Sequence, residues 1–169
     1  LGVTPSTWSG AKGFEINGAG NAVVGFSSGD LALTAGAYYN AGWKYALSGA
    51  AVTRYETWAG AHYWATAPSG TAGDAISFTQ AMTLTAAGRL GIGTTAPGAK
   101  LSVASNGEAI RMSGNTPYLS YRSADDATVF GYIQHTGTNL AIVNSQAGTI
   151  DLYTSNTLKA TLTSAGNLG

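Results

Sequence analysis

The sequence predicts an all-β protein, elongated and repetitive, and two observations lead to this fold class. Apolar residues alternate with Thr, Ser, Ala or Lys in short runs, and Gly, Asn, Asp, Ser or Pro bounds each run, as in strands separated by turns. Ala, Gly, Ser and Thr supply 89 of the 169 residues, whereas Leu, Ile, Val and Phe supply only 31. The chain is therefore short of large side chains for a core of its own.

In the first half, strands are expected around the alternating apolar residues Phe14/Ile16, Leu31/Leu33, Trp43/Tyr45/Leu47, Ile76/Phe78 and Met82/Leu84. The Ala-rich segment 35–52 has some helix propensity. Gly36, Gly42 and Gly49 interrupt it, and glycine costs about 1 kcal/mol in a helix interior. Strand and loop are therefore expected there.

In the second half, the same alternation predicts strands around Leu101/Val103, Ile110/Met112, Leu140/Ile142, Ile150/Leu152 and Leu158/Ala160/Leu162. The positions between them are mostly small or polar. One face of each strand is thus expected to lie against something apolar.

Two modules, 1–89 and 90–169, follow from internal repeats. LGVTPSTWSGAKGFEI begins at Leu1, and the similar LGIGTTAPGAKLSV begins at Leu90. TLTAAGRLG (83–91) likewise returns as TLTSAGNLG (161–169), where a further repeat would start. The sequence is accordingly expected to be a segment of a longer chain.

Each module would bury little large apolar surface by itself. Small residues allow backbones to approach closely, and stacking modules or wrapping several chains around one axis would supply the missing burial. The composition therefore favours an elongated homo-oligomer.

Charge and composition argue against several classes of protein. Eight Lys and Arg balance eight Asp and Glu, so there is no electrostatic argument for binding nucleic acid or an anionic membrane surface. No run approaches the roughly 18 apolar residues of a membrane span, and the first residues do not have the layout of a secretory signal. Without Cys, the chain has neither disulfides nor thiolate metal sites.

The segment GRLGIGTTAPGAKLSV (88–103), with the preceding TLTAAG, resembles a signature of bacteriophage tail fibres and tailspikes. The segment from Asn115 to the end is similar to modules interleaved with that signature. The resemblance covers roughly 83–169, whereas the first module departs from it at LGVTPSTW, where Thr4 and Pro5 replace Gly-Thr.

This resemblance implies a homotrimer of interwoven β-strands in the tail fibre of a virion, joined to adjacent fibre segments. It implies attachment to a bacterial surface polysaccharide or protein receptor. The cleaved C-terminal chaperone of many such fibres is not part of this sequence. A polysaccharide depolymerase tailspike and a bacterial β-repeat surface adhesin remain as alternatives.

Aromatic residues are concentrated between positions 38 and 64 and form a candidate carbohydrate-binding site, since flat rings stack on sugar faces. The same rings could instead fill a core between chains. Both can hold, because alternate residues of a strand face opposite ways. The candidates are Tyr38, Tyr39, Trp43, Tyr45, Tyr55, Trp58, Tyr63 and Trp64.

No catalytic residue, cofactor or metal site is expected. A glycosidase needs two carboxylates flanking the bond, but Asp30 and Glu56 are distant in sequence, and Asp125-Asp126 lies in an expected turn. His62 and His135 have no second ligand at metal-binding spacing. The Gly91-Ile92-Gly93 stretch lacks the spacing of a nucleotide loop. A turn with positive φ or a close chain approach explains it better.

Overall fold

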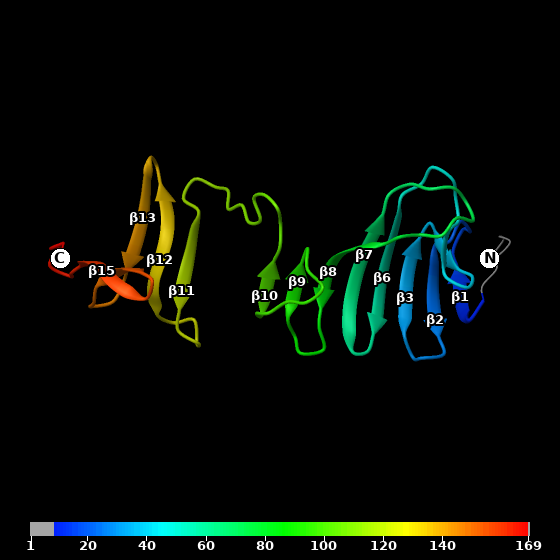
Figure 1. Ribbon diagram of the computed structural model, residues 1–169, viewed down its shortest axis with the longest axis horizontal. Coiled ribbons are helices and arrows are strands. Elements are labelled where there is room, and N and C mark those ends of the chain that lie inside the picture. Colours follow the sequence, from blue (N-terminus) through cyan, green and yellow to red (C-terminus); the bar gives the residue numbers. More distant parts are fainter. Residues whose placement is uncertain (1–8, 169) are drawn as a thin grey trace. The chain divides into compact units, whose positions relative to one another are not determined.

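The computed structural model describes residues 9–168, and these are all-β, with fifteen strands (Figure 1). The chain divides into two compact units, Leu1–Ala109 and Ile110–Gly169. No helix occurs among the described residues, and hence none long and apolar enough to cross a membrane.

The first unit is organised around an eight-stranded sheet in the order β1-β2-β3-β6-β7-β8-β9-β10, whose strands lie side by side in Figure 1. All neighbours are antiparallel except β9 and β10, which are parallel. β1 and β10 form the two edges. The strands are β1 (Ala11–Glu15), β2 (Ala22–Phe26), β3 (Leu31–Ala35), β6 (Val52–Trp58), β7 (Ala61–Ala67), β8 (Thr79–Leu84), β9 (Leu90–Ile92) and β10 (Leu101–Val103).

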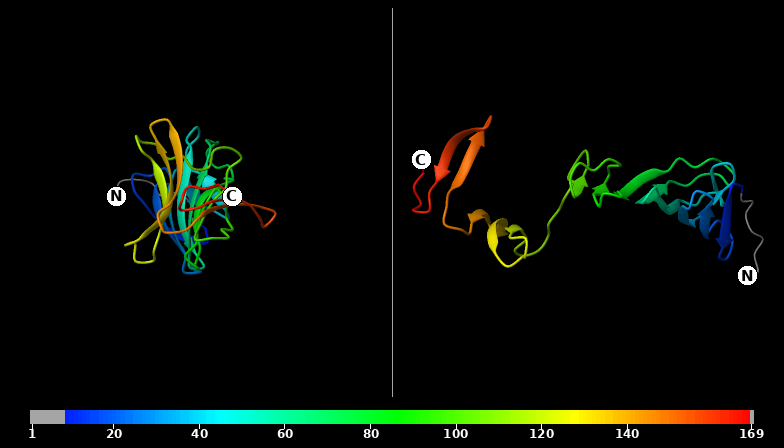
Figure 2. Two further views of the ribbon diagram at one scale, coloured as in Figure 1. Left: turned by 90° about the vertical axis from the view of Figure 1, so that its left-hand side faces the viewer. Right: turned by 90° about the horizontal axis from the view of Figure 1, so that it is seen from below.

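One face of this sheet, the covered face, is packed by a small second layer. The layer consists of a ribbon of β4 (Ala37–Tyr39) and β5 (Trp43–Tyr45) together with Ile76 and Phe78. Viewed from below, these segments lie along one side of the sheet (Figure 2, right). The layer and the sheet enclose two clusters of mostly small buried residues, Ala37, Tyr45, Val52 and Ala67 in one and Ala22, Val24 and Ala32 in the other.

The second unit contains two separate sheets and no buried side chain among its described residues. β11 (Tyr118–Arg122), β12 (Val129–Thr136) and β13 (Asn139–Asn144) form an antiparallel sheet. β14 (Ile150–Thr154) and β15 (Thr157–Leu162) form a hairpin. The few large apolar residues of this unit are thus not used to build a core within the chain.

The all-β prediction is confirmed, and most of the expected strands are present. Ile76/Phe78 and Ile110/Met112 are not strands, and Leu47 follows the end of β5. Ile76 and Phe78 pack on the core from an irregular segment instead. The compact units divide at 109/110, whereas the sequence repeat begins at Leu90, because β9 and β10 pair into the first sheet.

The repeated TLTxAGxLG segments form the same turn. In the first copy the Thr85 amide donates to the Arg89 carbonyl (2.9 Å) and the Gly88 amide to the Thr85 carbonyl (2.8 Å). In the second, Thr163, Gly166 and Asn167 repeat these bonds at 3.0 and 2.9 Å. Gly88 and Gly166 both have positive φ, +67° and +81°. The opening repeat at Leu1–Trp8 lies outside the described residues.

The glycines of the signature are required by close backbone approaches, as the sequence suggested. A Cβ on Gly91 would lie 2.5 Å from the Thr94 carbonyl oxygen, within the loop that connects β9 to β10. A Cβ on Gly93, whose φ is +69°, would lie 2.3 Å from the carbonyl oxygen of Ala104. The signature thus forms the short parallel pair of strands β9 and β10, with no room for side chains at these two positions.

We expect Gly93→Ala to lower the free energy of unfolding by about 3 kcal/mol, because it combines a left-handed backbone with a backbone clash. Gly98→Ala is the control, since its Cβ meets nothing within 4 Å and its φ is not positive. Guanidinium unfolding at equal protein concentration measures both. Equal midpoints for the two variants would contradict this account of the signature.

Candidate functional site

The structure separates the eight candidate aromatic residues into groups on different faces rather than gathering them into one patch. Adjacent strand residues alternate between faces, and directly paired residues on neighbouring strands share a face. Tyr55 and Trp64 are paired, as are Glu56 and Tyr63. Tyr55 and Trp64 thus lie on one face of the sheet, and Trp58 and Tyr63 lie on the other.

Tyr39, Trp43 and Tyr45 belong to the layer over the covered face. The rings of Tyr39 and Trp43 meet edge to face at 5.4 Å, and Trp43 also contacts Phe26 and Phe78 at 6.0 and 6.2 Å. Tyr45 is buried, and its hydroxyl donates to the Pro68 carbonyl at 2.9 Å. These rings hold the covering layer together. Tyr38, half-buried in β4, points the opposite way from its neighbours.

The opposite face of the sheet, the open face, carries a continuous row of large apolar side chains. Each strand contributes one residue, and each residue is directly paired with the next across the sheet. We call this row the apolar ladder, and it consists of Phe14, Val23, Leu33, Tyr55, Trp64, Met82, Ile92 and Val103.

The apolar ladder is accessible along its length. Phe14 and Leu33 are 52% and 45% exposed, and Tyr55 and Trp64 at its centre are half-buried. His62 lies beside both rings, with interplanar angles of 22° to each, and shares a hydrogen bond of 2.6 Å with the Tyr55 hydroxyl. A shallow hollow lies beside Leu33, Tyr55 and Trp64. No member of the apolar ladder is fully buried within the chain.

Charged residues are concentrated on the covered face. Glu15, Arg54 and Glu56 lie on that face, whereas Lys12 is the one charged residue of these eight strands on the open face. Isolated soluble sheets normally bury apolar residues and expose charges. This sheet has the reverse arrangement.

The Arg54 guanidinium is at the centre of the covered face. It lies over the rings of Trp43 and Phe78, 5.0 and 4.5 Å from their centroids, and 3.0 Å from the Glu56 carboxylate. Its buried Nε has no hydrogen-bond partner among the described residues. Burial lowers the pKa of Arg54 and raises that of Glu56, and their mutual attraction opposes both shifts. Through the contacts of Arg54 with Trp43 and Phe78, the Arg54–Glu56 ion pair links the sheet to the layer that covers it.

Trp58 and Tyr63 form the remaining group, at the β6–β7 turn. Trp58 is 59% exposed, its ring lies 6.2 Å from that of Tyr63, and Glu56 is paired with Tyr63. An exposed indole beside a phenol and a carboxylate is an arrangement that can stack on a sugar and bind its hydroxyls. Of the eight candidates, these two are the best placed to meet a ligand.

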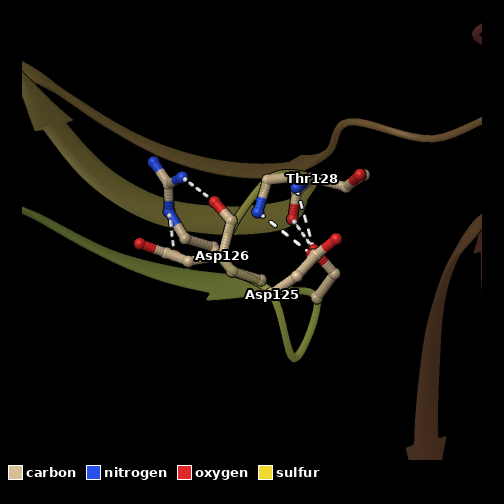
Figure 3. Close-up of polar contacts among 6 residues, drawn as sticks. Asp125, Asp126 and Thr128 are labelled. Atoms are coloured by element: carbon tan, nitrogen blue, oxygen red, sulfur yellow. Dashed lines mark hydrogen bonds and ion pairs between the residues drawn. The ribbon is translucent and has the colours of Figure 1, made fainter.

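The carboxylates considered for catalysis are held in structural contacts. Asp30 is close enough to raise the pKa of Glu56 slightly, but Glu56 is engaged by Arg54. Asp125 and Asp126 occupy an exposed turn (Figure 3). The Ser123 hydroxyl and then the Ala127 amide lower the pKa of Asp125, and Asp126 pairs with Arg122 at 3.4 Å. The predicted turn is therefore present.

No group of three or more His, Asp or Glu side chains in the described part of the chain is arranged to hold a metal ion. His62 is part of the aromatic stack, and His135 lies near the end of β12, where its amide donates to the Pro117 carbonyl. The two histidines are far apart in the sequence and belong to different sheets.

Sequence reasoning did not identify the apolar ladder. It named Phe14, Leu33, Met82 and Val103 as members of alternating runs, but gave no pairing between strands. It also missed the Arg54–Glu56 pair, for which the i, i+2 spacing of opposite charges within one strand was the available signal.

Comparison with protein-family models and with curated proteins found no match to this chain.

Proposed function

We propose that this chain is a structural and adhesive segment of a bacteriophage tail fibre, in which three copies assemble around one axis and attach the virion to a host surface. The resemblance of residues 88–103 to tail-fibre sequences suggests the class. The structural observation that carries the proposal is the exposure of large apolar side chains in the sheets of both units.

This exposure supports an assembly because the chain buries so little by itself. Among the described residues, those of the buried hydrophobic core lie between Ala22 and Ala67, and most are alanine. In the second unit, Leu119 and Ile142 flank Ile133 in one cross-strand row and are 49% and 57% exposed. Contiguous apolar surface of this kind marks a protein interface. A fibre of identical chains would cover it in every repeat.

The adhesive role is assigned to the Trp58–Tyr63 group, since it faces away from the apolar ladder. Three copies of one weak sugar site on a rigid axis gain affinity through their effective concentration. A bacterial surface polysaccharide is therefore the proposed receptor.

Trp58→Ala is expected to weaken polysaccharide binding by about tenfold per site, corresponding to the loss of about 1.4 kcal/mol of ring stacking. A panel of purified capsule and O-antigen polysaccharides serves as the probe, and light scattering on the same samples reports the mass. Tyr153→Ala is the control, because Tyr153 is also 59% exposed. Loss of assembly in Trp58→Ala, or equal binding by both variants, would contradict this assignment.

The two alternative classes make different predictions in the same assays. A depolymerase would release reducing ends from one of the polysaccharides, whereas an adhesive fibre leaves them intact. A bacterial adhesin shares the β-repeat architecture. The isolated segment of an adhesin would not adsorb to host bacteria, whereas that of a tail fibre would. Wild-type mass near three times 17.1 kDa is expected for the fibre.

A further inference from the structure

We propose that the apolar ladder is the assembly face of the first unit, and that its occupants are the ladders of two further copies of this chain. This inference rests on the proposed function and adds the surface that performs the assembly. It follows from the register of the sheet, the distribution of charge, and the size of the exposed strip.

The register makes the ladder a single continuous strip. It crosses seven strand spacings of about 4.8 Å and is therefore roughly 34 Å long. A second paired row on the same face adds Leu31, Leu84, Leu90 and Leu101. The two rows together form one continuous apolar strip across the sheet. It matches the dimensions of an interface between folded proteins.

Charge and polarity identify the kind of occupant. The ladder has one hydroxyl, that of Tyr55, and it is already hydrogen-bonded to His62. Lys12 lies at the β1 end of the same face. A sugar or a nucleic acid would find few groups to bind there, whereas another apolar surface loses nothing by contact.

A second copy of this chain is the apolar partner that the structure itself provides. Exposed apolar rows recur in the second unit. A partner must therefore cover apolar surface in both units, and not only the ladder. An identical chain does so in every sheet. Because the ladder runs across the strands, three ladders around a threefold axis would line that axis, with the strands running across it and the covered faces outward.

The same arrangement accounts for the charges on the covered face. Glu15, Arg54 and Glu56 would lie beneath the outer layer of the fibre, toward solvent, and the open face would be dry. Trp58 and Tyr63 would point outward, where a receptor can reach them. Once three copies are assembled, the apolar residues are buried and the charged residues lie toward solvent, as is usual in soluble proteins.

The test is Leu33→Asp, a charge within the ladder next to its central Tyr55, compared with Leu47→Asp, the same change at a leucine of similar exposure outside it. Leu33 is 45% exposed and Leu47 49%, so neither change removes a side chain buried within one chain. Light scattering is expected to give about three times 17.1 kDa for wild type and Leu47→Asp, and a threefold fall for Leu33→Asp.

Thiol labelling provides a second measurement that does not depend on disrupting the assembly. The chain has no cysteine, so Leu33→Cys and Leu47→Cys each introduce a single thiol. In variants that keep the wild-type mass, a maleimide is expected to label Leu33→Cys about tenfold more slowly than Leu47→Cys.

The outcomes separate this inference from the proposed function. An assembled wild type whose Leu33→Asp variant keeps its mass, or whose Leu33→Cys thiol reacts as fast as that of Leu47→Cys, would overturn the ladder interface and leave the fibre standing. A wild-type mass of 17.1 kDa would overturn both.

Discussion

Tyr45→Ala is expected to lower the free energy of unfolding by about 4 kcal/mol and to detach the layer over the covered face. Tyr45 is 7% exposed and packs against Ala37, Val52 and Ala67, and removing a buried aromatic ring leaves a large cavity. Its backbone also anchors the 71–75 loop, through bonds to Asp74 and Gly73. Guanidinium unfolding measures the loss, and hydrogen exchange of β4 and β5 locates it.

Tyr45→Phe is the matched control. It retains the ring and removes the hydroxyl that donates to the Pro68 carbonyl, which costs about 1 kcal/mol. Fast exchange confined to β4 and β5 in Tyr45→Ala, with near-normal exchange in Tyr45→Phe, is the expected pattern. If both variants lost the same stability, the ring would not be what holds this layer.

Arg54→Met is expected to cost about 3 kcal/mol at neutral pH. It removes the guanidinium between Trp43 and Phe78, and it leaves the Glu56 carboxylate without its ion-pair partner. The two side chains are only 17% and 19% exposed, so water replaces the lost contacts poorly. Arg122→Met is the control, since Arg122 pairs with an Asp126 that is 81% exposed, and we expect a loss of about 0.5 kcal/mol or less.

The cost of Arg54→Met should also depend on pH. Burial raises the pKa of Glu56 in the folded chain above its unfolded value, and Arg54 opposes this shift. A group with a raised folded pKa stabilises the fold below its unfolded pKa and loses that contribution as pH rises through the folded pKa. Removing Arg54 enlarges the effect, so the difference between variant and wild type should be smaller near pH 4 than near pH 7. A constant difference would indicate that Glu56 is not buried.

Fold class was readable from the sequence because strand alternation and turn residues are local signals. The alternation around Leu31/Leu33 and Leu140/Ile142 identified strands without any knowledge of their partners. Ile76 and Phe78 alternate in the same way, yet they lie in an irregular segment, since their rings and methyl groups are fixed by the core rather than by a neighbouring strand. Local pattern does not distinguish the two cases.

The candidate site was only partly predictable for a related reason. A stretch dense in aromatic residues could be seen, and so could the principle that alternate residues face opposite ways. Which ring faces which side depends on the pairing of Tyr55 with Trp64 and of Glu56 with Tyr63, which no single strand encodes. The ladder requires seven such pairings at once. The ladder is therefore defined only by the complete sheet.

The two edge strands of the large sheet also limit aggregation of this chain. β1 has a lysine and a glycine at successive positions of five, and β10 is three residues long. Short or charged margins are poor templates for adding further strands. Newly synthesised chains are thus less prone to pair through their edge strands into amyloid-like aggregates before their apolar faces are buried in the correct assembly.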